Sequence, residues 1–172
     1  MERNIRTHID MEILDIVDDQ DNVIGSATRD EIYKKLLPHR IVHILIFNDK
    51  NEMALQLRSK HVSFCPLYWC TAAVGHVQTG ESYEEGALRE YEEELGVASE
   101  LHMIGKDIYE APDKPKKFIT VYRAIFNGSF TKDERDVEKV EFFPVEKIRQ
   151  MVKDGEKFHP ESLFILKKYF VD

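Results

Sequence analysis

The sequence predicts an α+β fold in which a mixed β-sheet lies between helices. Three observations predict this class: β-rich segments outnumber helical ones, turn residues join most of the strands directly, and the helices are few and come mostly late in the chain. The chain has 172 residues, of which 42% are hydrophobic and 33% charged, a balance that suffices for one sizeable core. No internal repeat, low-complexity stretch or long linker divides it. We therefore expect residues 1–172 to form a single domain.

Two hairpins and one short helix are expected in the first third of the chain. Residues 12–29 hold two apolar runs on either side of a polar turn, which is typical of an N-terminal hairpin extension. Residues 30–37 favour a short helix that ends before Pro38, because the proline ring disfavours helical geometry in the preceding residue. The β-rich runs 41–47 and 53–58 are separated by a second polar turn and predict a second hairpin.

The rest of the chain is expected to alternate strands with three helices. Residues 61–74 are mixed and aromatic, and we expect them to be half loop before a short strand near residues 72–74. A helix then begins near Ser82, and turn residues delimit the segments that follow it. The later strands are expected at 101–111, 117–126 and 140–143, and the last helices at about 145–152 and 161–171.

Composition excludes several classes of function. The formal net charge is −8 without a Lys/Arg-rich tract, so we expect no nucleic acid partner. The longest apolar run, residues 41–47, is too short to span a bilayer and the N-terminus has no secretory segment, so we expect no membrane partner and a cytoplasmic location. Cys65 and Cys70 match neither a zinc site nor a disulfide framework, which favours reduced core thiols.

The segment at residues 75–97 carries the chemistry. Ser82 and Glu85 have the spacing of a capping box, and Gly96 suits the left-handed position after a helix end. On the helix between them, Glu90, Glu93 and Glu94 fall within an arc of roughly 100°. The residues expected to pack against the core from an adjacent arc are Ala87, Leu88, Tyr91 and Leu95.

Three carboxylates at these spacings repel one another unless a cation neutralises them. Hard oxygen ligands of this kind suit Mg²⁺ or Mn²⁺. A solvated acidic face is the alternative, but two features of the neighbouring sequence favour a metal. Gly75 and Gly80 bracket a loop before the helix whose backbone can offer a carbonyl ligand, and Arg89 is within reach of Glu81, so that it can hold the loop to the helix.

The full spacing is Gly, five residues, Glu, seven residues, Arg-Glu, and then Glu-Glu and Gly. It resembles the Nudix box in every charged and glycine position, with one departure. Tyr91 stands where the family usually has an aliphatic residue, and its hydroxyl needs a partner. The resemblance implies a Nudix-like α/β/α sandwich with a mixed sheet.

The resemblance also implies an activity: water attack on the diphosphate bond of a nucleoside diphosphate derivative or a similar small molecule, with Mg²⁺ as cofactor and Mn²⁺ as a substitute. Glu90, Glu93 and Glu94 then become metal ligands or catalytic carboxylates, with the Gly75 carbonyl as a further ligand and Glu93 or Glu90 as the general base. Glu81 and Arg89 support this geometry.

Four residues outside the helix are further candidates. Glu141 stands where many Nudix proteins have a distal metal-binding carboxylate, although an exposed strand residue is an equal alternative. Arg58 and Lys60 are candidates for substrate phosphate, or else exposed charges at a strand end. His76 is a candidate for substrate binding, or else a structural hydrogen-bonding group.

Residues 14–18, 38–43 and 57–60, with Pro66 and Trp69, resemble the Nudix branch related to isopentenyl-diphosphate isomerase. The likeness covers roughly residues 12–155 and gives a second hypothesis, the isomerase itself. Relatives commonly have glycine after the proline and aspartate after the tryptophan, whereas here leucine and cysteine follow. We therefore expect a different loop path, and the substrate stays open.

Two features, the missing cysteine and the intact helix signature, favour hydrolysis over isomerisation. The isomerase pattern places a catalytic cysteine directly before Gly-His, where this chain has Val74, and Cys70 lies four residues earlier. Isomerases also use upstream histidines as metal ligands, and here His39 and His76 match two of the positions whereas Ile32 occupies another. The helix signature, which isomerases degrade, is intact. A non-catalytic module that binds a diphosphate ligand is a third hypothesis, and a homodimer stays open.

Overall fold

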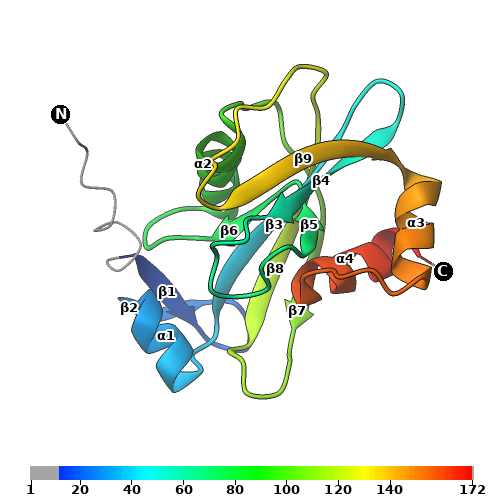
Figure 1. The fold of residues 1–172 in the computed structure, drawn as a ribbon. Helices are drawn as coiled ribbons and strands as arrows, with labels where there is room; N and C mark the ends of the chain where they lie inside the picture. Colours follow the sequence, from blue (N-terminus) through cyan, green and yellow to red (C-terminus); the bar gives the residue numbers. More distant parts are fainter. Residues whose placement is uncertain (1–11, 172) are drawn as a thin grey trace.

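A computed structural model describes residues 12–171 of the chain (Figure 1). Its elements alternate as the sequence predicts, with strands in the majority. The strands are β1 (Ile13–Val17), β2 (Val23–Thr28), β3 (His39–Phe47), β4 (Glu52–Arg58), β5 (Trp69–Thr71), β6 (Ala73–His76), β7 (His102–Tyr109), β8 (Lys117–Ile125) and β9 (Val137–Pro144). The helices are α1 (Arg29–Lys35), α2 (Tyr83–Leu95), α3 (Val145–Lys153) and α4 (Pro160–Phe170).

The main sheet is mixed, as predicted. β3 and β8 are parallel, with His39 opposite Lys117 at one end and Phe47 opposite Ile125 at the other. β6 runs antiparallel along the other edge of β3, and β7 runs antiparallel along β8. β4 pairs with β5 and β9, and meets β3 only beside their connecting turn. Consequently β3 and β8 begin, and β6 ends, at the same end of the sheet.

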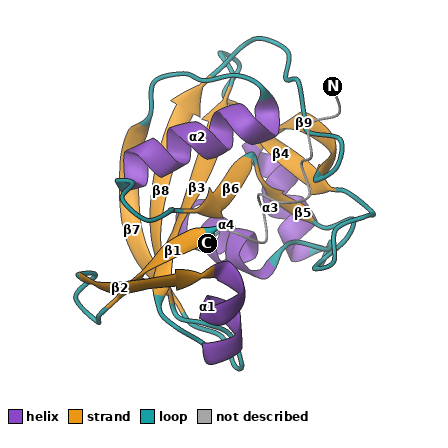
Figure 2. Ribbon diagram, turned by 90° about the vertical axis from the view of Figure 1, so that its left-hand side faces the viewer, coloured by secondary structure: helices purple, strands orange, loops and turns teal. Residues whose placement is uncertain are grey.

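Side chains of β3 alternate between two cores, because successive residues of a strand face opposite sides. Ile44 and Ile46 belong to a cluster that includes residues of α2, whereas Leu45 and Phe47 belong to a cluster that includes residues of α3 and α4. Figure 2 shows α2 on one side of the sheet and the last two helices on the other. The predicted α/β/α sandwich is therefore confirmed.

The N-terminal hairpin lies beside the loop that precedes α2. β1 and β2 form a separate two-stranded sheet (Figure 2). Leu14 bridges Gln78, and the Thr79 amide donates to the Ile13 carbonyl over 2.9 Å. The hairpin thus brings the start of β1 to the glycine-containing loop. That the whole chain is one domain stays a prediction.

Three details differ from the predictions. β5 at Trp69–Thr71 falls in a segment expected to be mostly loop, because a strand of 3 residues is too short to show alternation. β9 begins at Val137, not at residue 140. Leu88 was expected to face the core but is 37% exposed, and the α2 residues that pack in the core are Ala87, Tyr91 and Leu95.

None of the helices within residues 12–171 is long and apolar enough to cross a membrane.

Candidate active site

Local interactions fix both ends of α2 as predicted. The Glu85 amide donates to the Ser82 hydroxyl over 3.1 Å, and the Ser82 amide donates to the Glu85 carboxylate over 2.7 Å, which completes the capping box. Gly96 ends the helix with a φ of 67°. A Cβ there would also lie 2.8 Å from the Thr131 side chain, so the position needs glycine for two reasons. The helix is thereby held in register with the loop before it.

The Glu90 side chain lies directly against the backbone of Gly75. A Cβ on Gly75 would overlap the carboxyl carbon of Glu90, so only glycine leaves room for this side chain. Glu90 is 9% exposed. Gly75 lies in β6, near the end of the strand that leads to α2 in the sequence. Two of the predicted ligand positions, one from the helix and one from the strand, are thus adjacent.

Arg89 joins the loop, the helix and two carboxylates. Its Nε and Nη2 donate to the two oxygens of Glu81 over 2.6 and 3.0 Å, and Nη2 also donates to the His76 carbonyl over 2.8 Å. Its Nη1 donates to Glu90 over 2.8 Å and to Glu93 over 3.3 Å. The predicted contact with Glu81 is therefore present, and one guanidinium also offsets part of the negative charge of the helix.

The carboxylates of α2 carry more negative charge than their surroundings balance. Burial raises the pKa of Glu94, and the charge of Glu90 raises it further. Burial likewise raises the pKa of Glu90, although Arg89 opposes this shift. The Gln56 amide donates to Glu94 over 2.9 Å and fixes its orientation. Buried carboxylates that resist ionisation are the kind of group that a bound cation stabilises.

This donor set fits a hard divalent cation, which prefers carboxylate and carbonyl oxygens. Within residues 12–171 no three His, Cys, Asp or Glu side chains already converge as a metal site. The Arg89 guanidinium instead lies between Glu90 and Glu93 and occupies part of the space between their oxygens. Binding of a cation would therefore require these two contacts to lengthen, while the contacts of Arg89 with Glu81 and His76 can stay.

A cavity of about 1500 Å³ extends from these carboxylates to the start of α4. Glu90, Glu93 and Glu94 line it at the α2 end, and Lys117 and Glu161 line it at the α4 end. It lies at the end of the sheet where β3 and β8 begin and β6 ends. A small elongated molecule can therefore contact both ends at once.

The other predicted site residues divide into those inside and those outside the cavity. Arg58 and His76 line it. Arg58 donates from Nε to the Phe64 carbonyl over 3.1 Å, and this contact holds its side chain beside the cavity. Lys60 is exposed and is not among the lining residues, so the structure does not bring it to the site.

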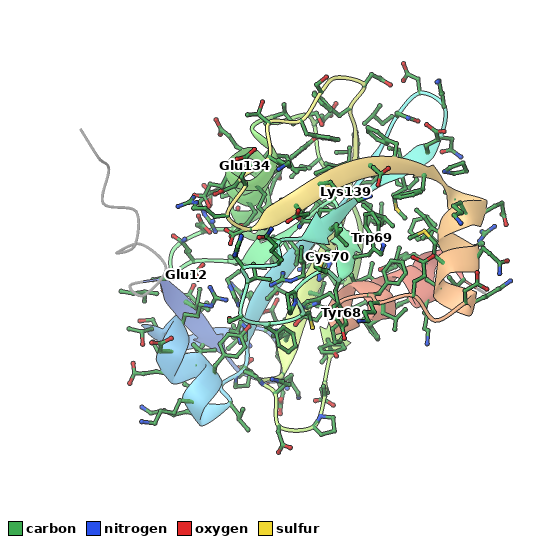
Figure 3. The ribbon with its side chains drawn as sticks, viewed as in Figure 1. Glu12, Tyr68, Trp69, Cys70, Glu134 and Lys139 are labelled. Carbon is green, nitrogen blue, oxygen red and sulfur yellow. The ribbon has the colours of Figure 1, made fainter. Side chains whose placement is uncertain are left out.

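The structure does not bring Glu141 to the cavity that the α2 carboxylates line. Glu141 lies opposite Leu55 in the β4–β9 pair, and Leu55 packs in the core on the α3 and α4 side. Its carboxylate is 2.6 Å from the ammonium of Lys139, which lies 5.2 Å from the centre of the Trp69 ring (Figure 3). The neighbours of Glu141 in β9, not Glu141 itself, face α2, because strand residues alternate.

His39 and His76 lie together but differ in access to the cavity. Their ring centres are 5.3 Å apart, and the Tyr33 hydroxyl is hydrogen-bonded to His76 Nε2 over 2.9 Å. His76 lines the cavity, whereas His39 is fully buried behind it. Burial lowers the pKa of His39 to about 4, and burial followed by the charge of Arg29 lowers the pKa of His76. Both rings are therefore neutral near pH 7.

Sequence reasoning missed Glu12, which lies at the start of β1 (Figure 3) and lines the cavity. Its carboxylate is 3.7 Å from His76 Nδ1 and 3.7 Å from the Arg29 guanidinium. Burial raises the pKa of Glu12, although Arg29 and Arg89 oppose the shift. No spacing in the sequence links Glu12 with α2, because the hairpin docking alone brings them together.

Sequence reasoning also missed Lys117 and Glu161, for which a signal was present. Lys117 lies on the same face of β8 as Ile119 and Val121, which pack in the core. The alternation of the sequence therefore indicated a charged residue on a buried face of the strand. Two acidic residues of the loop before β9 also line the cavity and carried no signal. They are Asp133 and Asp136.

Cys70, which precedes the Gly75 loop, is unsuited to catalysis. Cys70 is fully buried, and burial raises the pKa of its thiol to about 12. The thiolate, which is the reactive form, is therefore scarce at neutral pH. Val74 lines the cavity next to Gly75, at the position where a reactive cysteine would be needed for isomerisation.

Comparison with known proteins agrees with this geometry. A family profile described as "NUDIX domain" matches residues 37–163. An uncharacterised Nudix hydrolase from Pseudomonas aeruginosa is 31% identical over 165 residues, which cover 95% of this chain and 96% of that protein. An isopentenyl-diphosphate Δ-isomerase from Photorhabdus laumondii is 34% identical over 122 residues, which cover 71% of this chain and 69% of the isomerase. The crystal structure of DR0079 from Deinococcus radiodurans shares the fold, with a TM-score of 0.77 and 23% identity over 91% of this chain and 98% of that one.

Proposed function

The chain belongs to the Nudix family, and from this premise we propose that it is a Mg²⁺-dependent hydrolase that cleaves the diphosphate bond of a nucleoside diphosphate derivative or a similar small molecule. One observation carries the proposal. The Glu90 carboxylate lies on the backbone of Gly75, beside two further carboxylates of the same helix, and Arg89 joins this helix to the preceding loop. The arrangement supplies oxygen ligands for a cation at the end of a cavity that can hold the substrate.

Glu90, Glu94 and the carbonyl of Gly75 are the residues that would hold the metal, with Glu93 beside them. When bound, Mg²⁺ would neutralise diphosphate charge and make a water molecule more acidic. Arg89 keeps its contacts with Glu81 and His76 in this arrangement, so that the loop stays fixed to the helix.

Glu93 is the better placed of the two candidate bases. Its side chain is 61% exposed and lines the cavity, whereas the Glu90 side chain is 12% exposed and lies against Gly75. A water molecule can therefore approach Glu93, which would accept the proton as the water attacks phosphorus. The same argument leaves Glu90 to hold and orient the metal.

Arg58 and Lys114 line the cavity and are suited to the diphosphate. Neither forms an ion pair with a carboxylate among residues 12–171, so both can offer donors to phosphate oxygens. The Lys114 ammonium lies 5.0 Å from the centre of the Phe64 ring, which restricts its position without neutralising it.

The isomerase is the second candidate, because one relative with 34% identity has that name. The site supports it less well. Val74 offers no acid or base, and the Cys70 thiol is buried. The Lys117 ammonium also lies 5.2 Å from the centre of the Tyr33 ring, which contacts both His39 and His76, and this positive charge disfavours a cation beside the two histidines.

The test is hydrolysis of a panel of diphosphate compounds in Mg²⁺ by the full chain and by Glu93→Gln. Wild-type protein should release nucleotide or phosphate from at least one compound, and Glu93→Gln should lower kcat by about 100-fold or more, because it removes the base. Glu92→Gln is the matched control. It makes the same change on the neighbouring exposed residue, which does not line the cavity.

Three results would count against the proposal: no turnover of any compound, full activity of Glu93→Gln, or an equal loss in Glu92→Gln. Conversion of isopentenyl to dimethylallyl diphosphate, assayed in parallel, would favour the isomerase instead. Tight binding of a diphosphate without cleavage in either Mg²⁺ or Mn²⁺ would favour a non-catalytic module.

A further inference from the structure

The α4 end of the cavity contains a buried ion pair that the hydrolytic reaction does not use. The Lys117 ammonium donates to the Glu161 carboxylate, and each side chain is only 8% exposed. Lys117 is the first residue of β8 and Glu161 lies in the first turn of α4. Both line the same cavity as the α2 carboxylates, so the pair is within reach of a molecule bound there.

Fold stability alone does not account for this pair. Two buried charges lose their hydration, and a well-packed hydrophobic pair of similar volume is often as stable or more so. The neighbouring positions on the same face of β8, Ile119 and Val121, are such hydrophobic residues. A charged pair at the cavity end of this row therefore points to an interaction that hydrophobic residues could not make.

Unsatisfied polar atoms surround the pair. His159 Nδ1 and His43 Nε2 are buried and have no hydrogen-bond partner among residues 12–171. His159 is 8% exposed and lines the cavity, and His43 Nε2 is 3.8 Å from Glu161, too far for a hydrogen bond. Buried polar atoms in folded proteins nearly always have partners, so the unpartnered Nδ1 of His159, a residue that lines the cavity, points to a polar group in the adjacent part of the cavity.

From this geometry we infer that Lys117, Glu161 and His159 form a recognition subsite for a polar group of the substrate that carries adjacent hydrogen-bond donors and acceptors. A hydroxyl-bearing sugar and a nucleobase edge both have this chemistry, and a hydrocarbon chain does not. The ammonium donates, the carboxylate accepts and the histidine can do either. This inference rests on the proposed function in one respect, which is that the diphosphate lies at the α2 end.

An isoprenoid chain in this subsite would leave the ion pair and the histidine without partners. An unsatisfied buried polar or charged group is unfavourable, so the subsite should reject hydrocarbon and accept polar ligands. The subsite therefore distinguishes this chain from an enzyme of C5 diphosphates by binding as well as by chemistry.

The test measures ligand binding by isothermal titration calorimetry, with Ca²⁺ in place of Mg²⁺ to slow turnover. The ligands are pyrophosphate, isopentenyl diphosphate, ribose 5-diphosphate and ADP. Wild-type protein should bind ribose 5-diphosphate or ADP about tenfold more tightly than isopentenyl diphosphate, because each hydrogen bond to a charged group contributes on that scale. The sugar-only ligand separates recognition of the sugar from recognition of the base.

Two variants test the residues themselves. Glu161→Gln should lose about tenfold in affinity for the preferred polar ligand and keep its affinity for pyrophosphate, which does not reach the subsite. The double change Lys117→Met with Glu161→Leu replaces the pair by apolar groups, so it protects the fold and should give the same loss. Glu146→Gln is the control, because Glu146 also pairs with a basic residue but lies on α3 outside the cavity.

Equal wild-type affinity for the polar ligands and isopentenyl diphosphate would overturn the inference, and this comparison requires no variant. Unchanged affinity in Glu161→Gln would also overturn it and would indicate a structural network completed by water alone. Because binding is measured without turnover, the proposed function can fail separately. Absence of hydrolysis contradicts the hydrolase, and absence of discrimination contradicts the subsite.

Discussion

At the α2 end of the cavity Glu90 and Glu93 share one guanidinium and Glu94 contacts the Gln56 amide, whereas at the α4 end one carboxylate is matched by one ammonium. At the first end burial raises the pKa of Glu90 and of Glu94; Arg89 opposes the shift of Glu90, whereas the charge of Glu90 adds to the shift of Glu94. At the second end burial would raise the pKa of Glu161, but His43 and Lys117 outweigh burial and lower it. The first, unbalanced end is the one that we propose binds a cation, and at the second, balanced end the one carboxylate is already paired with an ammonium.

The largest expected effect comes from Gly75→Ala. The new Cβ would overlap the Glu90 carboxylate and push it away from the backbone, so the ligands of the unbalanced end separate. Activity and affinity for Mg²⁺ should each fall by about 100-fold. Steady-state kinetics and calorimetry with Mg²⁺ measure the two losses.

Gly25→Ala is the control for that change, because the nearest atom to its new Cβ is Ile16 Cδ1 at 3.8 Å, an ordinary contact. If Gly75→Ala keeps wild-type affinity for Mg²⁺, the unbalanced end does not bind the metal.

The two ends should also respond to pH in opposite directions. Glu90 and Glu94 have pKa values above the ordinary 4.5 in the folded protein, so the folded protein holds protons that the unfolded chain releases. The free energy of unfolding therefore falls as pH rises above 4.5. Glu161 has a folded pKa below 4.5, so its contribution is present above that pH and is lost as pH falls.

Thermal melting without metal should therefore show two patterns. Relative to wild type, Glu94→Gln should gain stability as pH rises above the ordinary 4.5, and Mg²⁺ should remove this gain. Glu161→Gln should be less stable than wild type at neutral pH, and the difference should shrink below about pH 4.5. Parallel curves for all three proteins would mean that the two ends do not differ in charge balance.

A smaller effect is expected from Glu12→Gln, which removes a carboxylate beside the unbalanced end without touching α2. Glutamine has the same shape as glutamate and can still form hydrogen bonds, so kcat should change by less than about tenfold. Affinity for Mg²⁺ should fall only slightly, because Glu12 contacts His76 and Arg29 and not the helix carboxylates. A loss as large as that of Glu93→Gln would place Glu12 in the catalytic machinery.

The sequence allowed prediction of the α2 end because its determinants are local. The capping pair Ser82 and Glu85, the terminal Gly96 and the reach of Arg89 to Glu81 all lie within one loop and helix. Helical periodicity and spacing are sufficient to place such residues relative to one another. The fold class followed from the same kind of information, since strand alternation and turn residues are also local.

The other parts of the site depend on contacts between distant segments. Glu12 reaches the cavity only because the hairpin docks at Gln78, and Glu161 meets Lys117 across 44 positions of sequence. Glu141 was proposed from its position after α2, whereas the face of its strand, which lies on the side of Leu55, could not be predicted. Strand pairing decides both matters, and one sequence does not specify which strands pair.

Binding of Mn²⁺, followed by electron paramagnetic resonance, reports on the metal held by the α2 carboxylates without the need for a substrate. Wild-type protein and Glu92→Gln should bind the ion equally, and Glu90→Gln should bind it about 10- to 100-fold more weakly. Equal affinity in Glu90→Gln and Glu92→Gln would contradict the account, since the carboxylate that lies on Gly75 would then have no part in holding the metal.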